Sequence, residues 1–324
     1  AGQILVATYP LIGNYGVNEY DFESEKVQVS GFVVREHCLS PSHSLSQRSL
    51  DDFLRLNSVV ALSDVDTRAI TRRLRTAGVM KGMIVVDELY DEAIRKLGEI
   101  PDYGDVNYVN KVSTRKPYNW QDKTSSLKES ETGQRIFVSD CGLKYNILRN
   151  LQSRGCNVHV VPSTITAAEL IAQKPDGVVL SPGPGNPDLL DHTTNMARNL
   201  IGKMPILGIC LGNQVIACAF GGRNYKLKFG HRGGNHPVRD VDTGLVHITA
   251  QNHGYAIDPD SLPREIKITH VNLNDDTVEG IRHTEYPVMG IQYHSEASPG
   301  PRDNEYIFDK FLDMVRDHAI DLVH

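Results

Sequence analysis

The stretch that most constrains the fold of this chain is residues 205–220, with the sequence PILGICLGNQVIACAF. Its apolar run at residues 206–209 is typical of a short buried strand. The small and apolar residues at 213–220 favour a helix, and only a few residues separate the two. The stretch therefore predicts a strand, a tight turn and a helix in direct succession.

The turn in this stretch carries a cysteine between two glycines. Gly208, Cys210 and Gly212 have the spacing of a G-x-nucleophile-x-G elbow, which sets the central side chain at the N-terminus of a helix. The partial positive charge at that terminus favours a thiolate over a thiol. Cys210 is therefore a candidate nucleophile. A buried structural cysteine is the alternative, because cysteine is among the most buried residue types.

Composition limits the class of protein. A chain of 324 residues and 36.0 kDa suggests two domains. A hydrophobic content of 40% and a charged content of 23% are typical of a soluble globular protein. The net charge of −6 gives no support for a nucleic-acid partner, and no apolar stretch is long enough to span a bilayer. We therefore expect neither a nucleic acid nor a membrane as a partner.

The cysteines and histidines show no regular ligand pattern. The cysteines form no C-x-x-C pair, so neither a disulfide framework nor a zinc site is indicated. With no signal-peptide pattern, this favours a reducing, cytoplasmic compartment, although a removed organelle-targeting segment would leave no trace. A site built from His236, His253 and His294 lacks short ligand spacing, so no metal is expected. The cysteines are Cys38, Cys141, Cys156, Cys210 and Cys218.

Three segments are predicted along the chain. Residues 1–118 have the pattern of a small mixed α/β domain, and the polar residues 119–133 are typical of a linker. A basic helix at 68–76 carries four arginines, which form either a partner-binding face or, more commonly, a solvated one. In the first segment, strands are expected at 3–8, 27–34, 59–62 and 83–86, and helices at 50–56, 68–76 and 90–97.

Residues 134–324 alternate apolar strands with helical segments. This order predicts a mostly parallel sheet flanked by helices, in which sites form beyond the carboxyl ends of the strands. One such end leads into the turn SPGPGNP at residues 181–187. Gly183 and Gly185 keep their N–H groups and allow close approach, so the turn is a candidate donor to an oxyanion. A plain tight turn is the alternative.

A histidine and a glutamate follow a later apolar strand, at residues 288–293. On an extended chain, residues two positions apart share a side, so Glu296 is placed to orient the imidazole of His294. With Cys210 these residues make a candidate set of nucleophile, base and orienting carboxylate.

These motifs resemble those of the class I glutamine amidotransferases, which have a catalytic triad. The resemblance is carried by residues 208–214, 294–296 and the turn at 181–187. It narrows to the small subunit of carbamoyl phosphate synthetase and covers nearly the whole chain. The motifs that narrow it lie at residues 64–68, 71–75, 230–238, 250–255 and 298–301.

The resemblance implies roles for individual residues. Cys210 attacks the side-chain amide of glutamine, His294 transfers protons and Glu296 orients His294, while water later cleaves the glutamyl thioester. The positions implied for glutamine and oxyanion binding are Gly183, Gly185, Leu211, Gln214, Asn252, Gly254 and Tyr255.

The resemblance also implies a partner. The ammonia is expected to pass to a large synthetase subunit, which makes carbamoyl phosphate from bicarbonate and two ATP. ATP, Mg and bicarbonate then belong to the partner subunit, and no cofactor is expected on this chain. The pathway served, arginine or pyrimidine synthesis, stays open.

The chain departs from the family pattern in three places. The family usually has a few dozen more residues before the first strand, including a serine that touches glutamine, so we expect a trimmed chain with an incomplete glutamine site. Ser295 and Asn213 replace a more usual proline and histidine, which we interpret as tolerated variation. The alternatives are the amidotransferase of another synthase, such as anthranilate synthase, and a non-catalytic regulatory homologue.

Overall fold

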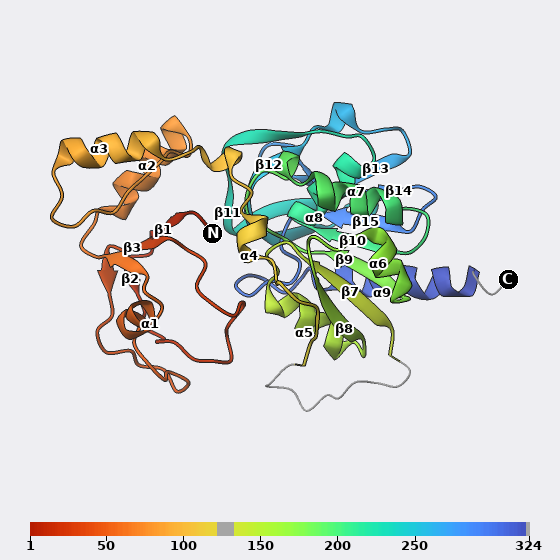
Figure 1. The fold of residues 1–324 in the computed structure, drawn as a ribbon, viewed down its shortest axis with the longest axis horizontal. Helices are drawn as coiled ribbons and strands as arrows, with labels where there is room; N and C mark the ends of the chain where they lie inside the picture. The colour runs from red at the N-terminus through yellow and green to blue at the C-terminus, as the bar shows by residue number, and fades with distance from the viewer. Residues whose placement is uncertain (122–132, 322–324) are drawn as a thin grey trace. The chain divides into compact units, whose positions relative to one another are not determined.

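The computed structural model describes residues 1–121 and 133–321 and divides into two compact units, Ala1–Tyr108 and Val109–His324 (Figure 1). The sequence analysis places the end of the first domain at residue 118. The structure divides the chain earlier, after Tyr108. Val109 is buried in the core of the second unit, and residues 118–119 pair with a strand of that unit's sheet. Most of the predicted linker at 119–133 lies outside the described residues.

The first unit is a small mixed α/β domain, as predicted. Its three-stranded sheet is parallel, in the order β1-β3-β5, and a second parallel pair joins β2 to β4. The strands are β1 (Ile4–Val6), β2 (Leu11–Ile12), β3 (Gly31–Val33), β4 (Glu36–His37) and β5 (Val60–Leu62). The helices are α1 (Leu50–Leu56), α2 (Thr67–Ala77), α3 (Tyr90–Glu99) and the short η1 (Tyr103–Asp105).

One predicted strand of this unit is wrong. Residues 83–86 form no strand, and Val85 and Val86 are 42% and 76% exposed. An apolar, β-branched run has strand propensity, but a strand forms only where the backbone pairs with a neighbour.

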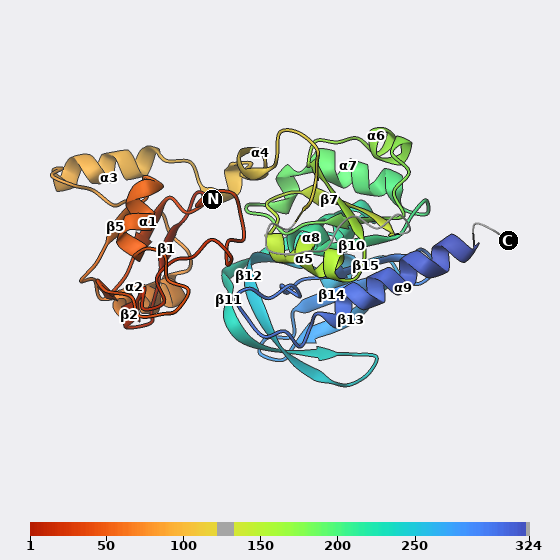
Figure 2. The same cartoon turned by 90° about the horizontal axis from the view of Figure 1, so that it is seen from below.

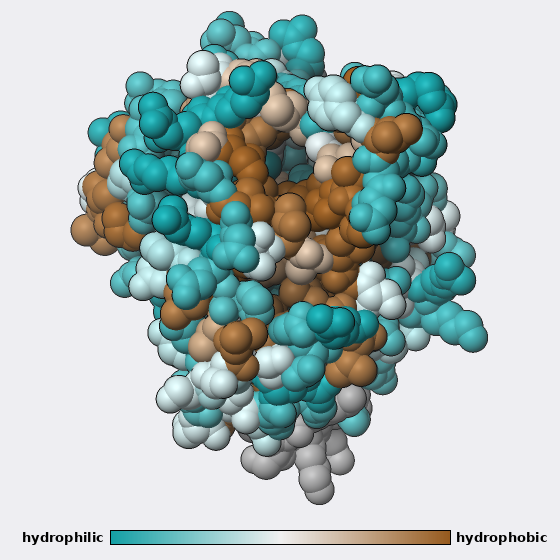
Figure 3. All heavy atoms as spheres, turned by 90° about the vertical axis from the view of Figure 1, so that its left-hand side faces the viewer, coloured by the Kyte–Doolittle hydropathy of each residue, from teal (hydrophilic) through white to brown (hydrophobic). Residues whose placement is uncertain are grey.

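Much of the apolar and basic surface of the first unit is uncovered. All three residues of β5 are exposed at the edge of the sheet, and Leu5 of β1 is 51% exposed. Figure 3 shows apolar side chains gathered on one face of the molecule. The four arginines of α2 are exposed as well, so the predicted basic helix presents its charges to solvent.

A ten-stranded sheet organises the second unit, in the order β12-β11-β13-β14-β15-β10-β9-β7-β8-β6. The strands β15-β10-β9-β7-β8 run parallel, which confirms the predicted parallel core. The other strands pair antiparallel and extend the sheet on both sides of that core. The core strands are β7 (Arg135–Asp140), β8 (Asn157–Pro162), β9 (Gly177–Leu180), β10 (Ile206–Ile209) and β15 (Val288–Ile291). The others are β6 (Tyr118–Asn119), β11 (Asn224–Asp240), β12 (Val246–Ile257), β13 (Ile266–Asn272) and β14 (Val278–His283).

Helices cover both faces of the parallel core (Figures 1 and 2). One cluster of buried residues packs α6, α7 and α8 against the sheet, and a second packs α5 and α9. Neighbouring strand residues join different clusters, as Ile206 and Leu207 do, because successive side chains point to opposite faces. The helices are α4 (Val109–Val112), α5 (Tyr145–Ser153), α6 (Ala167–Ala172), α7 (Asp191–Leu200), α8 (Leu211–Ala219) and α9 (Tyr306–Asp321), with η2 (Pro187–Leu189) and η3 (Pro259–Ser261).

Within residues 1–121 and 133–321, none of the helices combines the length and the apolar character needed to cross a membrane.

Candidate active site

The elbow predicted around Cys210 is present. Cys210 lies between β10 and α8, with φ 54° and ψ −103°, a backbone conformation that residues other than glycine seldom adopt. The helix begins at Leu211, earlier than predicted, so the cysteine directly precedes its first turn. A Cβ on Gly212 would lie 2.1 Å from the carbonyl oxygen of Leu180, and one on Gly208 would lie 2.5 Å from the Gly212 backbone. Both positions therefore require glycine.

The thiol of Cys210 is buried and has a side-chain neighbour from the next strand. The residue is 3% exposed, and its N–H donates to the carbonyl of Ile291 at 2.7 Å. Gln292 Nε2 donates to Cys210 Sγ at 3.6 Å. Cys210 directly precedes the nine-residue helix α8.

His294 and Glu296 form a buried pair, but not in the way the sequence predicts. β15 ends at Ile291, so both residues lie in the turn that follows the strand and not on an extended chain. The Ala297 N–H donates to the His294 carbonyl at 3.2 Å and closes this turn. His294 Nδ1 lies 2.7 Å from Glu296 Oε1. The predicted contact between His294 and Glu296 is therefore present, but a turn brings the two side chains together and not an extended strand.

Charge interactions dominate this pair. Burial lowers the pKa of His294, but the charges of Glu296 and Cys210 together raise it to about 10. Burial raises the pKa of Glu296, but His294 and then Lys144 lower it to about 2. The pair is therefore an imidazolium and a carboxylate at neutral pH. Because Nδ1 is bonded to Glu296, Nε2 is the ring atom that is left to interact with the Cys210 thiol and with a substrate.

Two further residues hold the glutamate, and the sequence analysis missed both. Lys144 Nζ lies 3.2 Å from Glu296 Oε1 and donates to the Ala297 carbonyl, while Asn146 Nδ2 donates to the Glu296 carbonyl. Lys144 and Asn146 follow the carboxyl end of β7. Sites in parallel sheets form beyond such ends, so the same argument that indicated the other candidates applies to these two residues.

The glycine turn at 181–187 lies beside the elbow. A Cβ on Gly183 would lie 2.2 Å from the Cys141 carbonyl oxygen and 2.7 Å from Leu211 Cδ2, so only glycine fits there. Gly185 has φ 104°, in the region that favours glycine. Ser181 Oγ accepts from the Cys141 N–H at 2.9 Å and fixes the start of the turn. The structure thus places the backbone of Gly183 beside the side chain of Leu211.

The other predicted binding residues lie on α8 and β12. Gln214 Nε2 donates to the Tyr255 carbonyl at 2.8 Å and to Gln292 Oε1 at 3.0 Å. Gln292, which the sequence analysis missed, therefore links Gln214 to the Cys210 thiol. Asn252 is exposed and Gly254 half-buried on the same strand as Tyr255.

Comparison with known proteins identifies the family of each part of the chain. Residues 137–314 match the family model for the glutamine amidotransferase class-I domain, and residues 1–84 match that for the carbamoyl-phosphate synthase small chain, CPSase domain. The chain is 45% identical over 321 residues to the carbamoyl phosphate synthase small chain of Syntrophotalea carbinolica, covering 97% of this chain and 85% of that protein.

The chain belongs to the carbamoyl phosphate synthase small-chain family. The small chain of Aquifex aeolicus is also 45% identical over 321 residues, covering 97% of this chain and 86% of its own length. The match at residues 1–84 disfavours the amidotransferase of another synthase, since it identifies the N-terminal unit with this small-chain family.

The fold of the amidotransferase part occurs in a solved structure. A putative GMP synthase component from Thermoplasma acidophilum superposes with a TM-score of 0.53 at 26% identity. The match covers 60% of this small-chain family member and 100% of that protein. The predicted family and the class I amidotransferase-like α/β fold are thus confirmed.

Proposed function

We propose that this chain is the glutaminase subunit of a carbamoyl phosphate synthase. It hydrolyses glutamine and delivers the ammonia to a large synthase subunit. The observation that carries this proposal is the position of Cys210, at a strained elbow and in the electrostatic field of the His294–Glu296 pair. Such a set supports nucleophilic attack on an amide.

In the first half of the reaction, Cys210 Sγ forms a bond to the side-chain amide carbon of glutamine. The carbonyl electrons move to the oxygen, which accepts hydrogen bonds from the N–H groups of Leu211 and the turn of Gly183 and Gly185. His294 has taken the thiol proton and now gives it to the amide nitrogen. The carbon–nitrogen bond breaks, ammonia leaves, and a glutamyl thioester remains on Cys210.

In the second half, His294 removes a proton from water, which attacks the thioester carbon. The carbon–sulfur bond breaks, glutamate is released, and the proton returns to the thiolate–imidazolium pair. Glu296 holds the imidazole through Nδ1 and favours its charged form, and Lys144 keeps Glu296 ionised. Because Nδ1 is bonded to Glu296, each proton is held at His294 Nε2.

Gln214, Asn252, Gly254 and Tyr255 are proposed to hold the glutamine. The bonds of Gln214 to the Tyr255 carbonyl and to Gln292 support this, because they join the β12 segment to the nucleophile through a short chain of contacts. ATP, Mg and bicarbonate are assigned to the large subunit, so no cofactor takes part in the steps on this chain.

The test is the substitution Cys210→Ser in the complex with the family's large subunit. Glutamine-dependent carbamoyl phosphate synthesis should fall by roughly three orders of magnitude, as when other triad nucleophiles are removed. Synthesis from added ammonium salt should survive, because that chemistry belongs to the partner. The matched control is Cys218→Ser, a half-buried cysteine outside the elbow, which should keep both activities.

Two results would contradict the proposal. Loss of both activities in an assembled Cys210→Ser complex would mean that the chain does more than deliver ammonia. A wild-type complex that uses ammonium salt but not glutamine would indicate a non-catalytic regulatory subunit.

A further inference from the structure

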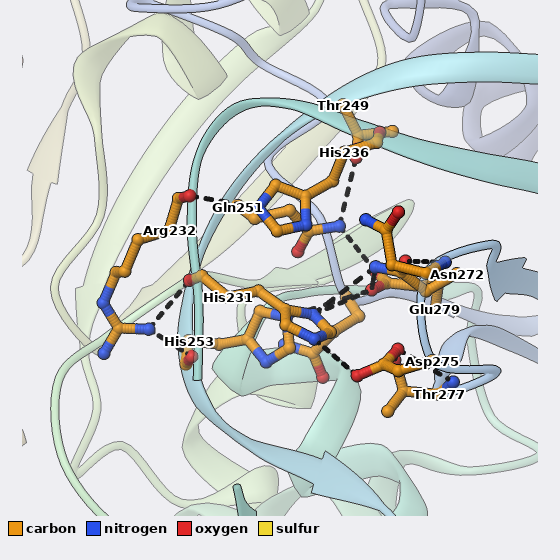
Figure 4. Close-up of polar contacts among 12 residues, drawn as sticks. His231, Arg232, His236, Thr249, Gln251, His253, Asn272, Asp275, Thr277 and Glu279 are labelled. Atoms are coloured by element: carbon orange, nitrogen blue, oxygen red, sulfur yellow. Dashed lines mark hydrogen bonds and ion pairs between the residues drawn. The ribbon is translucent and has the colours of Figure 1, made fainter. Parts of the chain in front are cut away.

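Two histidines and a glutamate meet in the antiparallel part of the sheet, apart from the proposed catalytic set (Figure 4). His231 on β11 and His253 on β12 are directly opposite in the strand register, and Glu279 comes from β14. Their side chains are 7%, 2% and 0% exposed. One ligand atom from each residue lies within 4.8 Å of the other two. Three potential metal ligands are therefore buried around one point.

The ring of His253 presents a lone pair to this point. Its Nδ1 lies 2.7 Å from the Tyr255 carbonyl oxygen, which can only accept, so Nδ1 carries the proton and Nε2 does not. Its Nε2 is buried, lies 3.9 Å from Glu279 Oε1 and has no hydrogen-bond partner among the described residues.

The other two residues are held in the same way. His231 Nε2 lies 2.8 Å from Asp275 Oδ2, and its Nδ1 lies 3.4 Å from Asn272 Nδ2 and 3.5 Å from Glu279 Oε1. Glu279 Oε1 accepts from Asn272 Nδ2 and Glu279 Oε2 from Gln251 Nε2, both at 2.9 Å. A carboxylate or backbone carbonyl behind each histidine, and amides behind the carboxylate, are the outer contacts that orient metal ligands.

The separations suit a tetrahedral ion. His231 Nδ1 and His253 Nε2 lie 3.5 Å and 3.9 Å from Glu279 Oε1. Ligand atoms about 2.0–2.1 Å from a shared tetrahedral zinc lie roughly 3.3 Å apart. The two contacts to Glu279 are therefore within about 0.6 Å of this spacing, and the two histidine nitrogens, which lie within 4.8 Å of each other, would have to approach on binding. Two imidazoles and one carboxylate are a ligand set that zinc commonly takes.

We propose that His231, His253 and Glu279 form a zinc-binding site. The competing occupant is a proton on His231 Nδ1, shared with Glu279 Oε1 at 3.5 Å. That proton satisfies His231 and Glu279 but leaves His253 Nε2 buried and unpaired, which is costly. A zinc ion would bind all three ligands at once. It would therefore also pair His253 Nε2, which a proton on His231 leaves without a partner in the described part of the chain.

Three protein ligands would leave the fourth position of a tetrahedral zinc to water. These ligands tie β12 to β11 and β14, and the Tyr255 carbonyl that orients His253 also accepts from Gln214. Zinc would therefore hold the β12 segment at 252–255 in place. The proposal does not depend on glutamine hydrolysis, because its test measures metal content and coordination.

The experiment uses the purified full chain, stripped with a chelator, dialysed against a small molar excess of zinc and analysed for metal. Wild type should retain one zinc per chain, with an X-ray absorption spectrum showing nitrogen and oxygen ligands and no sulfur. The variants His253→Gln and Glu279→Gln should weaken zinc binding by on the order of 100-fold or more in competition with a chromophoric chelator. His192→Gln, an exposed histidine on α7, is the matched control and should bind as wild type does.

Three outcomes would overturn the proposal. The first is a wild-type chain that retains no zinc above the buffer level, which would leave the protonated cluster as the resting state. The second is sulfur in the zinc shell, which would place the ion on a cysteine. The third is equal zinc affinity in Glu279→Gln and His192→Gln, with circular dichroism confirming that both variants are folded.

Discussion

At the scale of the residue, the backbone of Cys210 is the most unusual feature of the site. A positive φ in a residue other than glycine costs about 1–3 kcal/mol and persists only where the surroundings enforce it. The buried strand before it, the helix after it and the bond from its N–H to Ile291 supply that constraint. The thiol that this backbone carries interacts with His294 of the buried pair.

The charges of this pair predict how stability depends on pH. The lowered pKa of Glu296 adds stability above pH 4.5 that is lost as the pH falls toward about 2. The raised pKa of His294 adds stability below pH 6.5 that is lost as the pH rises through about 10. The loss of unfolding free energy in Glu296→Gln should therefore be largest between pH 4.5 and 6.5 and smaller on either side.

The measurement is urea unfolding of wild type and Glu296→Gln at pH values inside and outside that window. Glu265→Gln, an exposed glutamate, is the control and should show only a small, nearly constant difference. If the Glu296→Gln difference were the same at every pH, the pair would not be charged as described.

At the scale of the element, the site is a product of strand order. The neighbours β15, β10, β9 and β7 run parallel, so their carboxyl ends meet at one edge of the sheet. The segments that follow them carry His294 and Glu296, Cys210, the glycine turn, and Lys144. The chemistry therefore depends on the parallel core more than on any single helix.

The packing of α8 against β9 gives a prediction for Gly212→Ala. Inside a helix this change usually stabilises by about 0.5–1 kcal/mol. Here the new Cβ would lie 2.1 Å from the Leu180 carbonyl oxygen, so the free energy of unfolding should instead fall by about 1–3 kcal/mol. Thermal and urea unfolding measure the change.

Gly234→Ala is the control for this packing. A Cβ there would approach no atom more closely than 3.8 Å, so its effect should stay within about 0.5 kcal/mol. Stabilisation by Gly212→Ala would mean that the helix moves freely away from the strand, and the close contact would not be needed.

At the scale of the whole molecule, all the proposed catalytic and glutamine-binding residues belong to the second unit. That unit has two core clusters of its own, one on each face of its sheet. We therefore expect the fragment 109–324 to fold alone, with one cooperative unfolding transition and a Cys210 that a glutamine-analogue electrophile labels at the full-chain rate.

Mass mapping of the labelled fragment and calorimetry check this prediction. A fragment that binds hydrophobic dyes and unfolds without a transition would show that the first unit is needed for folding. A folded fragment with an unreactive Cys210 would show that the first unit contributes to the site.

The sequence by itself determined the local geometry of this protein. The elbow follows from an apolar run and two glycines, and the parallel core follows from alternating strands and helices, because these patterns act between near neighbours in the chain. The pairing of His294 with Glu296 is local as well, and holds although a turn replaces the expected strand. The motifs around them were sufficient to identify the family.

Only the tertiary structure decided which distant residues meet. Lys144 reaches Glu296 across 152 positions in the sequence (296 − 144) because β7 lies in the same parallel core, and no local pattern marks that contact. His231, His253 and Glu279 converge because the antiparallel strands adopt one register and bury one face. Residues 83–86 remain unpaired for the same reason: strand pairing depends on neighbours that the local sequence does not contain.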